Sequence, residues 1–183
     1  MSASASLSPS SAEQTLERWN ALAADVRARL GPSGVSTMDE IRKRSGLEFL
    51  LAIRDGELPS TPIGHTLDFW PVEVEPGRVV FHGQPHARHY NPIGSVHGGW
   101  IATLLDSAVA CAVQSLLPQG RGYTTLELKV NFVRAVTDQA GPLRAEGKAI
   151  GVGGQVGTAE GRLTDSTGRL YAFATTTCLV FAL

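Results

Sequence analysis

One carboxylate stands alone in a long apolar stretch of the chain. Between Gly98 and Leu117 almost every residue is apolar or small, and Asp106 is the only charged one. Apolar residues recur here at helical spacing, and no Lys or Arg lies three or four residues from Asp106 to neutralise its charge. An ionised carboxylate is costly to bury without a partner. Asp106 therefore either bonds to a distant group or acts as a catalytic carboxylate in an enclosed apolar pocket.

Two glycines precede this predicted helix. The run HGG, which begins at His97, places residues without side chains where backbone N–H groups are free and the helix dipole is positive. Such a helix end can bind an anion or stabilise an oxyanion formed from a carbonyl group. The glycines alone would equally suit a tight turn. Their combination with Asp106 and Asn91 favours a catalytic role.

The elements around this helix indicate an α+β fold. Residues 70–74 and 78–81 are predicted strands of a hairpin, joined by a turn with Pro76 and Gly77 where a type II turn requires them. Further strands are predicted over 124–132, 142–151, 155–164 and 169–181. In the first of these, alternation places Leu126, Leu128 and Val130 on one face.

Short connections between the strands imply antiparallel pairing. The resulting sheet has one face to bury, and a single apolar helix is available to cover it. We therefore expect the sheet to wrap around that helix, which should be buried nearly all round. The residues expected at this contact are Ile101, Leu104, Leu105, Ala108, Val109, Ala112, Val113 and Leu116.

We divide the chain into an N-terminal extension, residues 1–44, and a main domain, residues 45–183. Residues 1–10 are of low complexity and expected to be disordered. A capping box at 10–13 and helically spaced apolar residues predict a helix that ends before Gly31. Residues 45–58 are predicted to form a second amphipathic helix. Both helices are expected to serve packing or an interface.

Composition excludes several functional classes. The 183 residues are 43% hydrophobic and 18% charged, with a net charge of −1, so nothing indicates nucleic-acid binding. No signal-peptide pattern opens the chain, and its longest apolar stretch, 100–117, is too interrupted for a membrane span. We expect a cytoplasmic protein. Cys111 and Cys178 lie in apolar runs and should be reduced and buried.

Two rival sites are weaker. His82, His86 and His89 lie close together, but no HExxH or CxxC motif accompanies them, so no metal is expected. Cys111 could be proposed as a nucleophile, but five residues beyond Asp106 it points roughly 140° away around the helix. A small buried apolar residue is the better interpretation.

The pattern N-x₅-HGG-x₆-D in NPIGSVHGGWIATLLD resembles that of the PaaI-type hotdog-fold acyl-CoA thioesterases. The likeness runs from about residue 45 to 181, through LEFLLAIRDGELP, EVEPGRVVFHG, HYNP, YTTLELKVNFVRAV and ATTTCLVF. It implies a hotdog fold, an antiparallel sheet wrapped around one long central helix, here with extra N-terminal helices. It further implies homodimers that assemble into tetramers, and hydrolysis of an acyl-CoA thioester without a metal or an organic cofactor.

The resemblance also implies residue roles. Asp106 matches the family's catalytic carboxylate, acting as general base on water or as nucleophile. Gly98 matches the residue whose N–H polarises the thioester carbonyl. Asn91 matches an amide that holds water or substrate, and His97 a histidine that shapes the oxyanion loop.

Three further residues are substrate-contact candidates. Thr125 matches a hydroxyl residue that assists near the carboxylate, and Thr124 is the weaker candidate for that position. Gly99 continues the glycine run at the helix start. The glycines of Gly151-Val152-Gly153-Gly154 occupy a turn where many relatives carry Arg or His near the CoA phosphates.

Helix geometry predicts a site shared between two subunits. At about 1.5 Å per residue, Gly98 and Asp106 lie roughly 12 Å apart, too far to act on one carbonyl. A two-fold dimer would bring Asp106 of one chain beside Gly98 and Asn91 of the other. The alternative function is a non-catalytic acyl-CoA sensor. The acyl group is expected to be aryl or medium-chain; four aromatic residues could line its pocket or simply fill the core, namely Trp70, Phe81, Trp100 and Tyr123.

Overall fold

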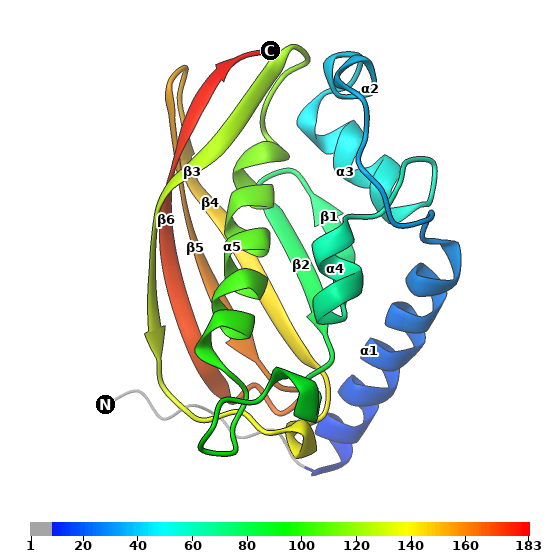
Figure 1. Ribbon diagram of the computed structural model, residues 1–183, viewed down its shortest axis with the longest axis vertical. Helices are drawn as coiled ribbons and strands as arrows, with labels where there is room; N and C mark the ends of the chain where they lie inside the picture. The colour runs from blue at the N-terminus through cyan, green and yellow to red at the C-terminus, as the bar shows by residue number, and fades with distance from the viewer. Residues whose placement is uncertain (1–8) are drawn as a thin grey trace.

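The computed structural model describes residues 9–183. Six strands form one antiparallel sheet that curves around a long helix, α5 (Gly98–Gln114) (Figure 1). The strand order is β1-β2-β4-β5-β6-β3. The strands are β1 (Phe69–Glu75), β2 (Arg78–Gly83), β3 (Arg121–Phe132), β4 (Leu143–Val152), β5 (Val156–Thr164) and β6 (Leu170–Ala182). The predicted α+β architecture, one sheet around one apolar helix, is confirmed.

The strand boundaries follow the sequence pattern closely. β4, β5 and β6 each begin and end within one residue of the predicted positions. The β1–β2 hairpin is present, with Gly77 at a φ of +76°, the left-handed value that the turn requires of its third residue. β3 begins three residues earlier than predicted, at Arg121.

One prediction for β3 is wrong. The alternating pattern places Leu126 on the same face as Leu128, but the register with β6 shifts between Thr125 and Glu127 and leaves Leu126 in a bulge, 61% exposed. Because a bulge inserts one residue, it reverses the side on which the preceding residues point. Thr125 therefore shares the inner face with Leu128, and this change decides which threonine can approach α5.

Helix α5 lies close against the sheet because glycines face it. A Cβ atom on Gly147 of β4 would lie 2.2 Å from the backbone oxygen of Ala108. Gly157 and Gly161 of β5 are approached almost as closely by α5 side chains. Larger residues at these positions would push the helix away from the sheet.

Burial of α5 is less complete than predicted. The expected contact residues up to Val113 are at most 3% exposed, but Leu116 lies beyond the helix end and is 44% exposed. Asp106 and its neighbour Ala102 are only half-buried. The sheet lies behind α5 in Figure 1, and none of the helices and strands described for residues 9–183 covers the side that faces the viewer. The described part of one chain therefore leaves Asp106 only half-buried.

Four helices precede the sheet: α1 (Pro9–Arg29), α2 (Met38–Arg42), α3 (Gly46–Arg54) and α4 (Pro62–Leu67). The disorder expected for residues 1–10 concerns mainly residues outside those described, and α1 begins at Pro9, so Ser10 lies within the helix and does not cap it. α3 ends four residues before the predicted end, where Gly56 adopts a φ of +80°. α2 and α4 were not predicted, since they are too short for a periodic pattern.

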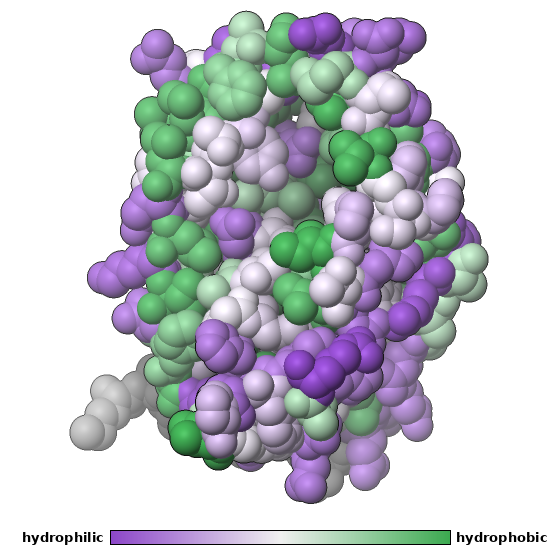
Figure 2. All heavy atoms as spheres, in the orientation of Figure 1, coloured by the Kyte–Doolittle hydropathy of each residue, from purple (hydrophilic) through white to green (hydrophobic). Residues whose placement is uncertain are grey.

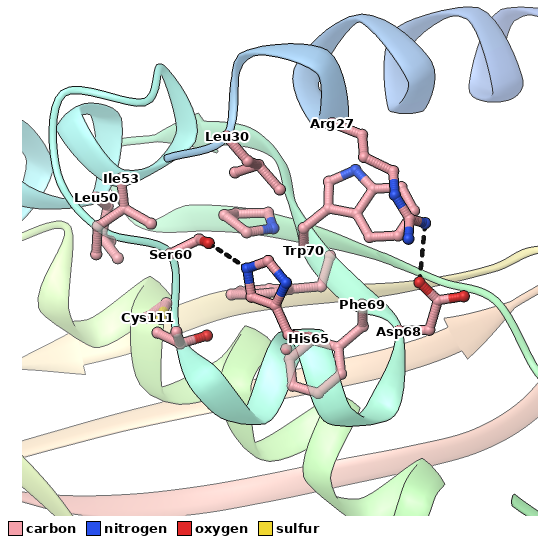
Figure 3. A pocket seen from close by; sticks show the side chains of 14 residues that line it. Arg27, Leu30, Leu50, Ile53, Ser60, His65, Asp68, Phe69, Trp70 and Cys111 are labelled. Atoms are coloured by element: carbon pink, nitrogen blue, oxygen red, sulfur yellow. Dashed lines mark hydrogen bonds and ion pairs between the residues drawn. The ribbon is translucent and has the colours of Figure 1, made fainter. Parts of the chain in front are cut away.

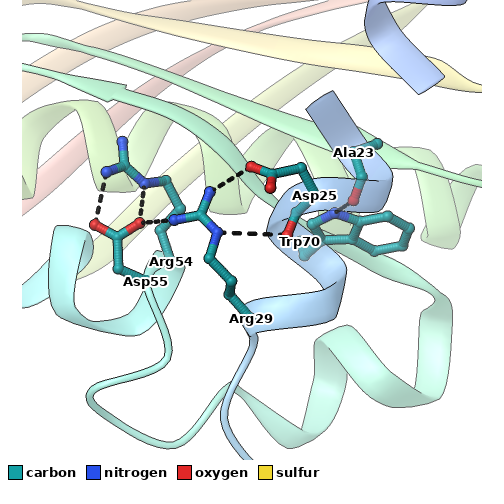
Figure 4. Close-up of polar contacts among 6 residues, drawn as sticks. All are labelled: Ala23, Asp25, Arg29, Arg54, Asp55 and Trp70. Carbon is teal, nitrogen blue, oxygen red and sulfur yellow. Dashed lines mark hydrogen bonds and ion pairs between the residues drawn. The ribbon is translucent and has the colours of Figure 1, made fainter. Parts of the chain in front are cut away.

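Helix α1 packs on the outer face of the sheet at its β1–β2 end. Its Ala23 and Val26 are buried against Trp70 and its neighbours, and the indole N–H of Trp70 donates to the Ala23 carbonyl at 3.2 Å (Figure 4). Apolar residues on the other half of this face are exposed, and Figure 2 shows apolar colour along the β3–β6 side. No helix within residues 9–183 combines the length and apolarity needed to cross a membrane.

Candidate active site

Asp106 and Thr125 meet between α5 and β3. The Thr125 hydroxyl donates a hydrogen bond to Oδ1 of Asp106 at 3.1 Å. The bulge at Leu126 directs Thr125 towards the helix and leaves Thr124 exposed on the opposite face. Within residues 9–183 no cationic side chain forms an ion pair with Asp106. The carboxylate thus has one neutral hydrogen-bond donor beside it and no neutralising charge.

The start of α5 presents a free backbone N–H. His97 caps the helix, and its Nδ1 accepts the N–H of Gly99 at 2.8 Å. The N–H of Gly98 has no hydrogen-bond partner in the part of the chain that is described. A Cβ on Gly98 would lie 3.0 Å from the ring of Phe132, so a larger residue would displace that ring. A free N–H at the positive end of a helix dipole suits a negatively charged oxygen.

Asn91 organises the loop that leads to this helix. Its Oδ1 accepts the N–H groups of Ile93 and Ser95 at 3.1 and 3.2 Å, and its Nδ2 donates to the Ser95 hydroxyl at 2.9 Å. These bonds form a local turn of the kind that Asn favours. The side chain therefore has a structural task within its own chain, in addition to any contact with substrate or water.

Gly98 is the first residue of α5 and Asp106 lies at the middle of the same helix. Eight residues of α-helix separate them by about 12 Å, a distance that the rigid helix fixes. Each chain therefore carries the two halves of the candidate site apart from one another.

Residues 93–172 match the family model described as Thioesterase superfamily. The match begins before α5 and ends at the start of β6. A Halobacterium salinarum protein named “Putative esterase” is 36% identical over 85 residues, which are 45% of this chain and 54% of that protein. The chain thus matches about half the length of that curated relative.

Two solved structures with related names share the fold. A phenylacetic acid degradation-related protein of Ralstonia eutropha JMP134 is 28% identical with a TM-score of 0.65, over 74% of this chain and 99% of the other. The PaaI protein of the E. coli phenylacetic acid degradation operon is 21% identical with a TM-score of 0.60, over 66% and 84% of the two chains. The predicted hotdog fold is confirmed.

The structure also contains a cavity of about 240 Å³, shown in Figure 3. It lies between α1, α3, α4, β1 and α5, and its walls are mainly apolar. Trp70 and Phe81, two of the four aromatic residues considered for an acyl pocket, line it, whereas Trp100 and Tyr123 do not. Its α5 residue is Cys111, and neither Asp106 nor Thr125 lines it. This cavity is therefore separate from the candidate site.

A serine and a histidine meet at the cavity wall. The Ser60 hydroxyl donates to the Gly31 carbonyl at 2.8 Å and lies 2.5 Å from Nε2 of His65. Since the only hydroxyl hydrogen of Ser60 is used on Gly31, Nε2 of His65 must be the donor in the second bond. His65 consequently cannot take a proton from Ser60, and the pair joins segments without forming a nucleophile and base.

The histidines and cysteines considered as rival sites have other environments. His82 is buried, His86 bonds to Asp68 and His89 stacks on an indole ring. Among the described residues no three His, Cys, Asp or Glu side chains are grouped to hold a metal. Burial raises the pKa of Cys111 to about 12, which keeps its thiol protonated and a poor nucleophile.

Proposed function

We propose that the protein is an acyl-CoA thioesterase acting on an aryl or medium-chain acyl group. The observation that carries the proposal is Asp106, a half-buried carboxylate held by Thr125 and without a cationic partner among the described residues. Such a carboxylate is available to accept a proton from water. The family match supports thioester chemistry, and the name of the Ralstonia eutropha relative supports an aryl group.

In the proposed reaction the thioester carbonyl lies at the start of α5. Asp106 accepts a proton from water while the water oxygen attacks the carbonyl carbon. The N–H of Gly98 stabilises the resulting oxyanion. His97 and Gly99 shape the loop around that N–H, and Asn91 holds the substrate or the attacking water. Collapse of the intermediate expels the CoA thiolate, which takes up a proton, and leaves the carboxylic acid. In the variant mechanism Asp106 attacks directly and water then hydrolyses the anhydride.

We propose that two chains share each site. β3 is a twelve-residue strand at the sheet edge that, among the strands of residues 9–183, pairs only with β6, and an edge of this kind can pair with a second copy. Two-fold pairing there would place Asp106 and Thr125 of one chain near Gly98 and Asn91 of the other. The exposed outer face of β5 and β6 would then be available for a tetramer. On the sequence argument we place this enzyme in the cytoplasm.

Turnover by the purified protein tests the function. Phenylacetyl-, hydroxybenzoyl- and octanoyl-CoA are incubated with the protein, and released CoA is followed with a thiol reagent. We expect catalytic release with at least one of them. Saturable acyl-CoA binding without release would instead identify the non-catalytic sensor.

A further inference from the structure

We propose that helix α1 positions the oxyanion loop, residues 86–99, through the side chain of Asp68. The proposal rests on the proposed function, because it concerns the placement of the Gly98 N–H. Arg27, Asp68 and His86 are positioning residues: they hold the loop and do not contact the reacting atoms.

Asp68 is a constrained corner between α4 and β1. It is the only non-glycine residue within 9–183 with a positive φ, +56°, and it is 8% exposed. Such a conformation persists only where the surroundings enforce it. Its Oδ1 pairs with Arg27 of α1 at 2.8 Å (Figure 3), and its Oδ2 lies 2.6 Å from Nε2 of His86. Burial acts to raise the pKa of Asp68, but the His86 bond and the Arg27 charge hold that pKa below its ordinary value.

Contacts continue from His86 to the start of α5. The His86 N–H donates to Nδ1 of His89 at 3.2 Å, and the buried His89 ring stacks on Trp100 with centroids 5.5 Å apart. The His89 carbonyl accepts the N–H of His97 at 2.7 Å, and His97 caps α5 next to Gly98. Every step from Asp68 to the helix cap is therefore a direct contact.

The same corner holds the loop from its other end. The indole N–H of Trp100 donates to the Leu67 carbonyl at 2.8 Å, and Leu67 immediately precedes Asp68. Gly98 lies between the two anchored residues, His97 and Trp100. Because both anchors lead to one corner, a displacement of Asp68 would move both sides of the N–H that faces the carbonyl.

Arg27 and Arg29 provide a matched comparison. Arg27 lies 4.5 Å over the Trp70 ring and pairs with Asp68. Arg29, on the same helix, pairs with Asp25 and Asp55 at 2.8 Å each (Figure 4). Both arginines form ion pairs from α1, but only Arg27 pairs with a residue that contacts the oxyanion loop.

The kinetic test compares Asp68→Asn and Arg27→Gln with the control Arg29→Gln. Asn tolerates the left-handed conformation, so Asp68→Asn removes the charge while keeping the corner. Because the oxyanion is absent from the bound substrate and forms only when the carbonyl is attacked, we expect kcat to fall about ten-fold for Asp68→Asn and a few-fold for Arg27→Gln, with KM within about two-fold. Arg29→Gln should retain the wild-type kcat.

A second readout does not depend on turnover. In ¹⁵N-TROSY spectra we expect Asp68→Asn and Arg27→Gln to shift the amide signals of Gly98 and Gly99, and Arg29→Gln to leave them in place. If the Gly98 and Gly99 signals of Asp68→Asn and Arg27→Gln stay in place, the proposal is overturned. This holds even if these variants lose activity, because a lower melting temperature would then account for the loss. If Asp68→Asn does not fold, Arg27→Gln decides. If the wild-type protein hydrolyses no acyl-CoA, the proposed function fails, while the amide signals still decide whether α1 positions the loop.

Discussion

The carboxylate of Asp106 forms no ion pair with a cationic side chain among the described residues. Its neighbour Thr125 donates one hydrogen bond, and the side chain is half-buried. A structural aspartate in an apolar helix would be expected to bond with an arginine or with backbone N–H groups. The arrangement therefore favours a catalytic role for this carboxylate over a structural one.

Replacing Asp106 with Asn keeps the side-chain shape and removes its basicity. We expect Asp106→Asn to fold with an unchanged far-UV circular dichroism spectrum and to lose a factor of roughly 10² to 10⁴ in kcat, the usual effect of losing a general base. Steady-state hydrolysis of acyl-CoA measures this. Near-normal turnover by the variant would show that Asp106 has a structural role.

A second residue-scale prediction concerns the dependence of stability on pH. Burial lowers the pKa of His82 from 6.5 to about 4, the charges of Arg144 and Arg27 also lower it, and Asp68 acts in the opposite direction. Between these two pH values the unfolded chain binds a proton that the folded chain does not. The free energy of unfolding should therefore fall as the pH drops from about 6.5 to about 4, by up to about 3 kcal/mol from this group.

Denaturant titrations of the wild type and His82→Leu, at several pH values between 7 and 4, isolate this contribution. The variant should lose less stability than the wild type over this range. Parallel profiles for the two proteins would contradict the assignment to His82.

The contact between α5 and the sheet depends on positions where no side chain fits. On Gly147 a Cβ would meet the backbone of Ala108, which cannot move without shifting the helix. On Gly151 of the same strand, the nearest atom would be the Thr158 hydroxyl at 3.9 Å, an ordinary contact. The same substitution at these two glycines should therefore have very different effects.

We expect Gly147→Ala to reduce the free energy of unfolding by about 3 kcal/mol, and Gly151→Ala to change it by no more than about 0.5 kcal/mol. Denaturant unfolding of both variants checks this. Equal effects would mean that close approach of α5 is not what requires Gly147.

At the scale of the whole molecule, one chain leaves its candidate site divided. Asp106 and Gly98 are separated along α5, and the β3 edge and the uncovered side of α5 are both open. A two-fold partner would pair with the β3 edge and cover the exposed side of α5 at the same time. For this reason we expect the assembly to be required for activity.

Mixed dimers test the shared site. Asp106→Asn and Asn91→Ala, each inactive alone, should complement when co-expressed, since a mixed dimer has one doubly altered site and one intact site. Random pairing makes half of the dimers mixed, so about a quarter of the wild-type activity should return. Mixed dimers that are confirmed by mass spectrometry and remain inactive would place each site within one chain.

Local patterns were sufficient to predict much of this protein. The apolar helix around Asp106, the hairpin turn at Gly77 and the strands from residue 142 onwards follow from periodicity and turn chemistry, which depend on near neighbours in the chain. The HGG run and Asp106 could be singled out as candidate site residues for the same reason, because their types and spacing are visible without any fold.

Contacts between distant segments decided the rest. The bulge at Leu126 arises from pairing with β6, and it alone directs Thr125 towards Asp106. The left-handed corner at Asp68 is held by Arg27 of α1 and by His86, which no local pattern connects. Both features change the direction of a side chain in response to a partner far along the chain, so they are decided only when the tertiary structure brings these partners together.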